Sequence, residues 1–311
     1  MLSVLFVVLP VFALILAGWL ARKGNVLGPH ATTELNRFVV YLALPALLFD
    51  IVANAHWREI WRPDFIATFG LAAAIVFAAT VAAAVCLKRR LADAAIDGLN
   101  AAYPNTGFMG FPLALAALGP AALAPTLIAT ILVVCVVFAI ALILIQAALH
   151  AEQPSRGMAL KLTLSLARNP LIFAPALGAV ALALGAVIPA PAESFLKLLG
   201  GAAPPCALVA LGLFLAEPRG GARAAPGAIG ALVFLKLIAQ PLLTWVLAVH
   251  VFHLTPALTH VAVLLAALPT GTGPFMVAQL YQRNAGITSV VVLVSTVVSL
   301  VTITLYLHLA L

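Results

Sequence analysis

The sequence predicts an all-α polytopic membrane protein with ten transmembrane helices, arranged as two inverted five-helix repeats. Three observations predict this fold class: the composition, a recurring series of long apolar stretches, and prolines that recur at a nearly constant spacing. Of the 311 residues, 65% are hydrophobic and 8% are charged, whereas soluble proteins carry about 25% charged residues. Because so few charges cannot cover the surface of a soluble protein, we expect the chain to lie in a lipid bilayer.

Apolar stretches of about 20 residues recur along the chain, and each is long enough to cross the hydrocarbon layer of a membrane. The ten predicted segments are residues 2–21, 33–54, 64–87, 95–118, 121–149, 161–186, 193–216, 226–252, 257–281 and 286–310. Arg22 and Lys23 follow the first segment, whereas a cleaved signal peptide carries its basic residues in front. We therefore expect the first segment to be a retained helix.

The basic residues of the connections predict the orientation of the chain. The odd-numbered connections hold eleven Lys and Arg residues, and the even-numbered connections hold three. Since cytoplasmic loops carry an excess of Lys and Arg, the chain is predicted to be an integral plasma (inner) membrane protein with both termini extracytoplasmic. The net charge of +7 reflects these loops. We expect no nucleic-acid partner, because the basic residues form no dense patch.

Prolines at similar positions in the two halves indicate an internal repeat. The recurring pairs are Pro10 with Pro170 and Pro45 with Pro205, both 160 residues apart, and Pro104 with Pro269, 165 residues apart. Because each half holds five segments, an odd number, the second half enters the membrane with the opposite topology. The predicted repeats are residues 1–150 and 151–311.

Two segments carry interruptions that a continuous membrane helix would not tolerate. The stretch 100–112 holds two prolines, two glycines and a polar Asn-Thr pair, and the stretch 268–276 is similarly rich in Pro, Gly and Thr. Such breaks persist in a membrane only where protein buries them or where they line a cavity. Matching breaks in two halves point to the binding site of a secondary transporter. Pro104 and Pro269 are expected to shape the point where the broken helices cross.

The second half of each broken helix begins with amides that lack partners and with a partial positive charge. Two such ends directed at one point predict an anion site, with a carboxylate as the natural ligand. Amide and hydroxyl side chains can bind the ligand, and glycines let the backbone approach it. The candidate substrate-binding residues are Tyr103, Asn105, Thr106, Gly107, Thr270, Gly271, Thr272 and Gly273. In the alternative interpretation, Asn105 and the threonines only cap the helix ends.

Lys236 lies about ten residues inside the eighth segment, and charges at this depth are candidates for function. We interpret Lys236 as a fixed cation that balances the carbonyl ends of the first half-helices. The alternatives are direct pairing with a carboxylate substrate and an uninvolved side chain that reaches the interface. The polar stripe of Ser295, Ser299 and Thr302 on the last segment is interpreted as a helix-packing surface.

At the two breaks the sequence resembles the auxin efflux carrier family, which includes PIN-type plant auxin exporters and bacterial carriers proposed for malate and malonate. The stretches that carry the resemblance are residues 105–112, 42–49, 169–170 and 236–243. The resemblance implies the fold of sodium–bile-acid symporters and elevator-type alternating access. It also implies a scaffold from about 1–54 and 161–216, a transport domain from about 64–149 and 226–310, and a homodimer through the scaffold.

The sequence thus predicts a secondary transporter that moves small organic carboxylate anions, either malonate- or malate-like or auxin-like acids. The alternatives are an anion channel and a sodium-coupled symporter of the bile-acid type. No acidic residue is predicted near the middle of the membrane in the transport domain, which argues against sodium coupling. We expect no enzyme, because no catalytic motif occurs, and we expect no cofactor and no metal.

Overall fold

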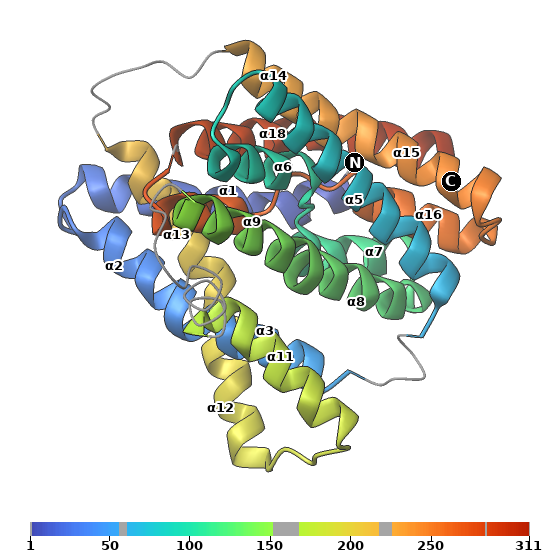
Figure 1. Cartoon of the computed structure of the whole chain (residues 1–311), viewed down its shortest axis with the longest axis horizontal. Helices are drawn as coiled ribbons and strands as arrows, with labels where there is room; N and C mark the ends of the chain where they lie inside the picture. The colour runs from blue at the N-terminus through green and yellow to red at the C-terminus, as the bar shows by residue number, and fades with distance from the viewer. Residues whose placement is uncertain (1, 56–60, 152–167, 218–225, 284, 311) are drawn as a thin grey trace.

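The computed structural model describes residues 2–55, 61–151, 168–217, 226–283 and 285–310. All regular secondary-structure elements within these residues are helices (Figure 1). Six helices in the described part are long and apolar enough to cross a membrane. They are Ala31–Ala53, Pro63–Cys86, Pro120–Ala151, Ala190–Ala216, Pro226–Val251 and Ala285–Leu309.

The helices follow the predicted segments closely. In the first half they are α1 (Leu2–Lys23), α2 (Ala31–Phe38), η1 (Val39–Ala43), α3 (Leu44–Ala53), α5 (Pro63–Cys86), α6 (Leu91–Ala102), η2 (Thr106–Gly110), α7 (Phe111–Leu118), η3 (Pro120–Ala122), α8 (Leu123–Ile131), η4 (Leu132–Val137) and α9 (Phe138–Ala151). In the second half they are α11 (Pro170–Ala183), α12 (Ala190–Gly201), α13 (Ala203–Ala216), α14 (Pro226–Phe234), η5 (Leu235–Ala239), α15 (Gln240–Val246), η6 (Leu247–Val251), α16 (Pro256–Ala266), α17 (Gly273–Leu280) and α18 (Ala285–Ala310).

Both predicted interruptions are confirmed, because α6 and η2 are separated at residues 103–105 and α16 and α17 at residues 267–272. The fourth segment begins at Leu91, four residues before the predicted start. The seventh is divided into α12 and α13, since prolines near the start of α13 cannot donate backbone hydrogen bonds to the turn before them. Residues 161–167 of the predicted sixth segment lie outside the described residues.

Three π-helical turns precede prolines, and the chemistry of proline explains their positions. The pairs are η1 with Pro45, η2 with Pro112 and η5 with Pro241. A proline has no N–H to donate to the carbonyl four residues earlier, and its ring crowds that carbonyl. The preceding turn therefore widens, and such wide turns are frequent at functional sites. One of them, η5, carries Lys236.

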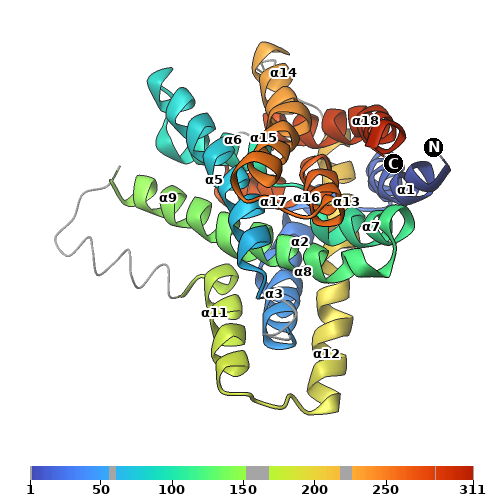
Figure 2. The same cartoon turned by 90° about the vertical axis from the view of Figure 1, so that its right-hand side faces the viewer.

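The helices pack in two groups. In one group α1 packs on α13 and α3 packs on both α11 and α12. In the other α5 packs on α6, α6 on α9 and α15 on α16. Figures 1 and 2 agree that α3, α11 and α12 extend together on the side of the molecule away from α14, α15 and α18.

Helices α1 and α13 approach closely at two glycines. A Cβ atom at Gly212 would overlap the carbonyl oxygen of Ile15, and a Cβ atom at Gly18 would overlap the carbonyl oxygen of Val209. Because both obstacles are backbone atoms, no change of side-chain rotamer can relieve the overlap. Small residues at such crossings let membrane helices gain close van der Waals contact.

We expect Gly212→Ala to destabilise the protein by about 1–3 kcal/mol, the usual cost of inserting a methyl group into a filled interface. The thermal unfolding midpoint in detergent should fall clearly below that of the wild type. Gly230→Ala on α14 is the matched control, since no atom lies within 4 Å of a Cβ there. Equal midpoints for the two variants would contradict the proposed role of this contact.

Candidate functional site

The two interrupted helices meet through their unwound backbones. The amide of Asn105 donates to the carbonyl of Pro269 at 2.8 Å, and the amide of Gly271 donates to the carbonyl of Tyr103 at 2.9 Å. These reciprocal bonds form a short antiparallel bridge centred on Pro104 and Thr270. We call residues 103–105 and 269–271 the crossover. The bridge satisfies backbone groups that the breaks release, which is what a membrane interior requires.

Residues of α6 and α18 hold the crossover from behind. The Thr270 hydroxyl donates to the carbonyl of Asn100 at 2.7 Å, and the Thr270 amide donates to the Ser295 hydroxyl at 3.1 Å. The Asn100 amide group in turn donates to the Thr288 hydroxyl at 3.1 Å. All four side chains are fully buried. Two side chains of α18 therefore fix the position of both breaks.

The carbonyl ends of both first half-helices receive donors from one face of the eighth segment. The Lys236 Nζ atom lies 2.6 Å from the carbonyl oxygen of Ala266, the last residue of α16. One turn later, the Gln240 side chain donates to the carbonyl oxygen of Ala102, the last residue of α6, at 3.4 Å. Lys236 is fully buried. Among the described residues it has no carboxylate partner.

The amide ends of both second half-helices carry polar side chains that are not used as caps. Asn105 precedes η2 and Thr272 precedes α17, and neither side chain accepts a capping hydrogen bond. The Thr106 hydroxyl is fully buried and has no hydrogen-bond partner within the described structure. The first backbone amides of a helix also lack intrahelical acceptors. Unused donors from the two breaks therefore gather at the crossover.

A cavity of about 240 Å³ opens in front of these donors. Its polar lining comes from the crossover and its neighbours, namely Tyr103, Asn105, Thr106, Thr130 and Thr272. The lining residues from η1, α3 and α13 are all apolar, namely Val39, Leu44, Leu47, Ile51, Ala203, Pro204 and Ala207. Other apolar lining residues are Phe108, Phe111, Val134 and Met276. The cavity thus lies between the crossover and helices of the other packing group.

Most of the candidate binding residues line this cavity. Tyr103, Pro104, Asn105, Thr106, Gly107, Thr272 and Gly273 belong to its wall. The side chain of Tyr103 lies against the second break, because a Cβ atom at Gly273 would come within 2.7 Å of its ring. Thr270, Gly271, Pro269 and Lys236 are not part of the cavity wall. They contribute instead to the hydrogen bonds that build the crossover and to those that hold its ends.

A comparison with known protein families decides the identity. A family model described as membrane transport protein matches residues 3–307. The chain belongs to this family, the auxin efflux carriers.

Two relatives support the family membership over most of their length. The chain is 35% identical over 304 residues to "Putative malonate transporter" of Rhizobium meliloti (strain 1021), covering 97% of this chain and 94% of the relative. It is 26% identical over 278 residues to "Uncharacterized transporter YfdV" of Escherichia coli (strain K12), covering 87% of this chain and 86% of the relative. This member of the auxin efflux carrier family is therefore an integral membrane transport protein, as the composition and the resemblance predicted.

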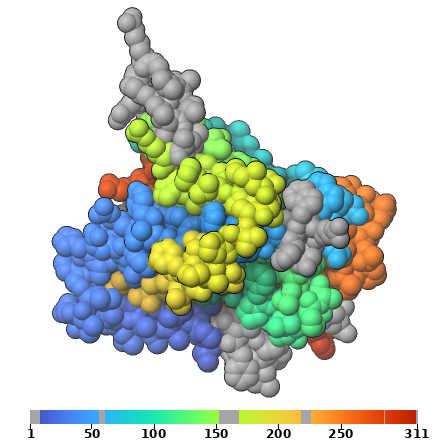
Figure 3. Space-filling view, turned by 90° about the horizontal axis from the view of Figure 1, so that it is seen from below, coloured from blue at the N-terminus to red at the C-terminus, as the bar shows by residue number. Residues whose placement is uncertain are grey.

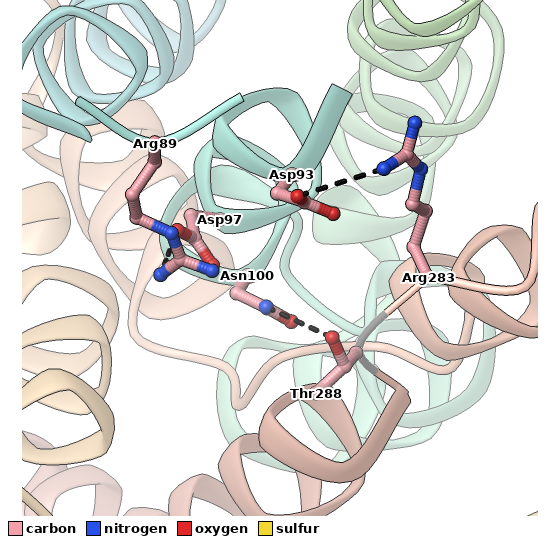
Figure 4. Close-up of polar contacts among 6 residues, drawn as sticks. All are labelled: Arg89, Asp93, Asp97, Asn100, Arg283 and Thr288. Carbon is pink, nitrogen blue, oxygen red and sulfur yellow. Dashed lines mark hydrogen bonds and ion pairs between the residues drawn. The ribbon is translucent and has the colours of Figure 1, made fainter. Parts of the chain in front are cut away.

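A row of polar residues, Asp93, Asp97 and Asn100, lies along α6 of this carrier-family protein (Figure 4). Asp93 pairs with Arg283 at 3.8 Å, and Asp97 pairs with Arg89 at 2.6 Å. Asn100 continues the same helix face at helical spacing and contacts Thr288. The Asp93–Arg283 and Asn100–Thr288 contacts join α6 to the chain after α17 and to α18. The row, in which Asp97 and Asn100 are buried and Asp93 is partly exposed, therefore ties the helices around the two breaks into one unit.

Several residues of the site were not assigned a role from the sequence. Gln240 is separated from Lys236 by four residues, which places both on one helix face, so their spacing could have identified it. Ser295 belongs to the stripe that was interpreted as helix packing, yet it binds a crossover amide. Asn100 and Thr288 gave no signal beyond being polar residues in apolar segments.

Proposed function

We propose that this membrane transport protein is a secondary carrier that holds a small organic carboxylate anion at the crossover. The proposal rests on three polar side chains that line one cavity. The buried Thr106 hydroxyl has no hydrogen-bond partner among the described residues, and the side chains of Asn105 and Thr272 make no capping hydrogen bond to the helices that follow them. Buried polar groups nearly always have partners. A transported ligand would supply them.

A carboxylate fits these groups chemically. Ionised oxygens accept hydrogen bonds from amides and hydroxyls, and such charge-assisted bonds are about twice as strong as neutral ones. In the proposed complex the Asn105 amide group and the Thr106 hydroxyl donate to the carboxylate, together with backbone amides near Gly107 and Gly273. The partial positive charges at the N-termini of η2–α7 and α17 each contribute roughly 0.3–1 kcal/mol of favourable interaction with the bound anion.

We propose that Lys236 and Gln240 balance the opposite ends of the breaks. The last carbonyls of α6 and α16 carry partial negative charge, and the two side chains donate to them. A fixed ammonium group at this position would make a bound metal cation unnecessary. This supports a carrier that does not use sodium rather than a sodium-coupled symporter.

We further propose elevator-type alternating access within ten inverted-repeat segments. The scaffold would comprise residues 1–54 and 161–216, and the transport domain residues 64–149 and 226–310. The cavity supports this division, because every polar side chain in its described lining belongs to the proposed transport domain, whereas the proposed scaffold contributes only apolar residues. Sliding along an apolar wall breaks few hydrogen bonds, so such a boundary suits a moving domain. The predicted orientation, with both termini extracytoplasmic, remains part of the proposal.

A homodimer through the scaffold is also proposed. Figure 3 shows α11 and α12 together on one face, next to helices of the N-terminal region. This face exposes large apolar side chains, among them Phe173, Leu177, Phe195 and Leu198. Such a surface can meet either lipid or a second copy. Cysteine cross-linking between copies at position 195 in native membranes would distinguish the two, since only a dimer gives a cross-linked pair.

Counterflow in proteoliposomes tests the proposed function. Vesicles loaded with unlabelled malonate, malate or an aromatic acetic acid should take up the labelled acid transiently above its equilibrium level, with the same rate in the presence and absence of sodium. A channel would give uptake without this transient excess. Absence of counterflow with every carboxylate, in folded and correctly reconstituted protein, would reject the proposal.

A further inference from the structure

The cavity at the crossover contains no charged side chain among the described residues that line it. Tyr103 is the one titratable group in this described lining, and a phenol is uncharged near neutral pH. The helices that line the cavity carry other titratable side chains, but these are not part of the lining: Tyr41, Asp50, Cys135 and Cys206. The attraction for an anion therefore comes only from neutral donors and helix ends.

The nearby cations are engaged elsewhere. Lys236 donates to the carbonyl of Ala266 behind the crossover and is not part of the cavity wall. Arg89 and Arg283 pair with Asp97 and Asp93 on the far part of α6. None of these three side chains is available to a second negative charge in the cavity.

The donors in the described lining also come from one part of the chain's fold. Asn105, Thr106 and Thr272 belong to the two breaks, whereas every lining residue from η1, α3 and α13 is apolar. The hydroxyl of Thr130 already donates to the carbonyl of Thr126 at 2.8 Å. One carboxylate can thus be satisfied, but a second ionised carboxylate would face apolar side chains. An uncompensated charge in such surroundings costs several kcal/mol, and a titratable group then takes up a proton instead.

We propose that the carrier accepts its substrate as a monoanion, with the rest of the ligand uncharged. Monocarboxylates bind directly, with their apolar body against Leu44, Leu47 and Ile51. A dicarboxylate such as malonate binds only after one carboxylate has taken a proton from water. Each dicarboxylate then carries one proton through the membrane and releases it on the other side, so proton and substrate move together without a titratable protein group. This inference rests on the proposed function and specifies its substrate.

Malonate and its monomethyl ester provide a matched pair of probes. The ester has nearly the same size but can carry only one negative charge. Labelled malonate and labelled monomethyl malonate are each measured in counterflow by the wild type, at equal pH on both sides of the membrane. The pH series starts below the second pKa of malonate and ends well above it.

We expect the half-saturating total concentration of malonate to rise about tenfold for each pH unit above that second pKa, as the singly protonated form becomes scarce. The value for the ester should stay constant, which controls for titration of the protein. A half-saturating concentration of malonate that does not change with pH would overturn the inference, as would a preference for malonate over the ester at high pH. Loss of counterflow for both acids and for aromatic acetic acids would instead reject the proposed function itself.

Discussion

Replacing Asn105 with aspartate is expected to lower carboxylate counterflow by a factor of about 100, because it puts a like charge beside the bound anion. Aspartate is nearly the same size as asparagine, so the backbone bond between Asn105 and Pro269 should persist. Asn105→Ala removes the donor without adding charge, and a hydrogen bond to a charged group contributes about 1.5–3 kcal/mol. We therefore expect a smaller loss for alanine, of about tenfold.

The initial rate of counterflow and the thermal unfolding midpoint should be measured together for both variants. The account expects midpoints near that of the wild type, since the Asn105 side chain has no capping role in the structure. Asn54→Ala is the matched control, because the side chain of that exposed asparagine donates to Asp50 just after the end of α3 and is not part of the cavity wall. Wild-type transport by Asn105→Asp would show that the anion binds elsewhere.

Replacing Lys236 with methionine is expected to reduce transport by about tenfold or more, together with a lower unfolding midpoint. Methionine keeps the length of the side chain but removes the charge. The carbonyl of Ala266 then loses its donor in a fully buried position, and an unsatisfied buried group costs about 1–3 kcal/mol. The end of α16 should loosen, and the bridge between the two breaks should lose its fixed geometry.

Two further variants separate the roles at the carbonyl ends. Lys236→Gln keeps a donor without the charge, so it should retain more stability than methionine. Gln240→Leu should have a smaller effect, because its bond to Ala102 is longer and neutral. Lys197→Met, at an exposed lysine paired with Glu193, is the control. Unchanged folding and transport in both Lys236→Met and Lys236→Gln would contradict the proposed charge balance.

The sequence predicted the breaks because their cause is local. Proline and glycine within an apolar stretch disrupt a helix whatever surrounds them, so the interruptions could be located in advance within residues 100–112 and 268–276. The start of α6 was missed by four residues, since Asp93 and the preceding Lys88, Arg89 and Arg90 interrupt the apolar signal before position 95 although residues 91–94 form the first turn of the helix. Hydrophobicity locates the membrane-spanning part of a helix but not its polar extension.

The residues that bind the crossover could not be predicted from the sequence, because they come from distant parts of the chain. Thr270 is held by Asn100 and Ser295, and nothing in the local pattern of either residue distinguishes this role from packing. Apolar lining residues of the cavity come from α3 and α13. The sequences of these helices do not differ from those of ordinary membrane helices. Which polar groups lack a hydrogen-bond partner depends on the completed packing, so the absence of a partner for the Thr106 hydroxyl within the described residues appears only in the structure.

Direct binding to the purified protein tests the central claim most simply, because it requires no transport cycle. Equilibrium binding of a labelled aromatic acetic acid, and its competition by monomethyl malonate, should be measured for the wild type, Asn105→Asp and Thr106→Val. We expect saturable binding at one site per chain in the wild type. Binding should be weakened strongly in Asn105→Asp and by about tenfold in Thr106→Val, which loses a hydrogen bond to the ligand. Equal binding by all three proteins would contradict an anion site at the crossover.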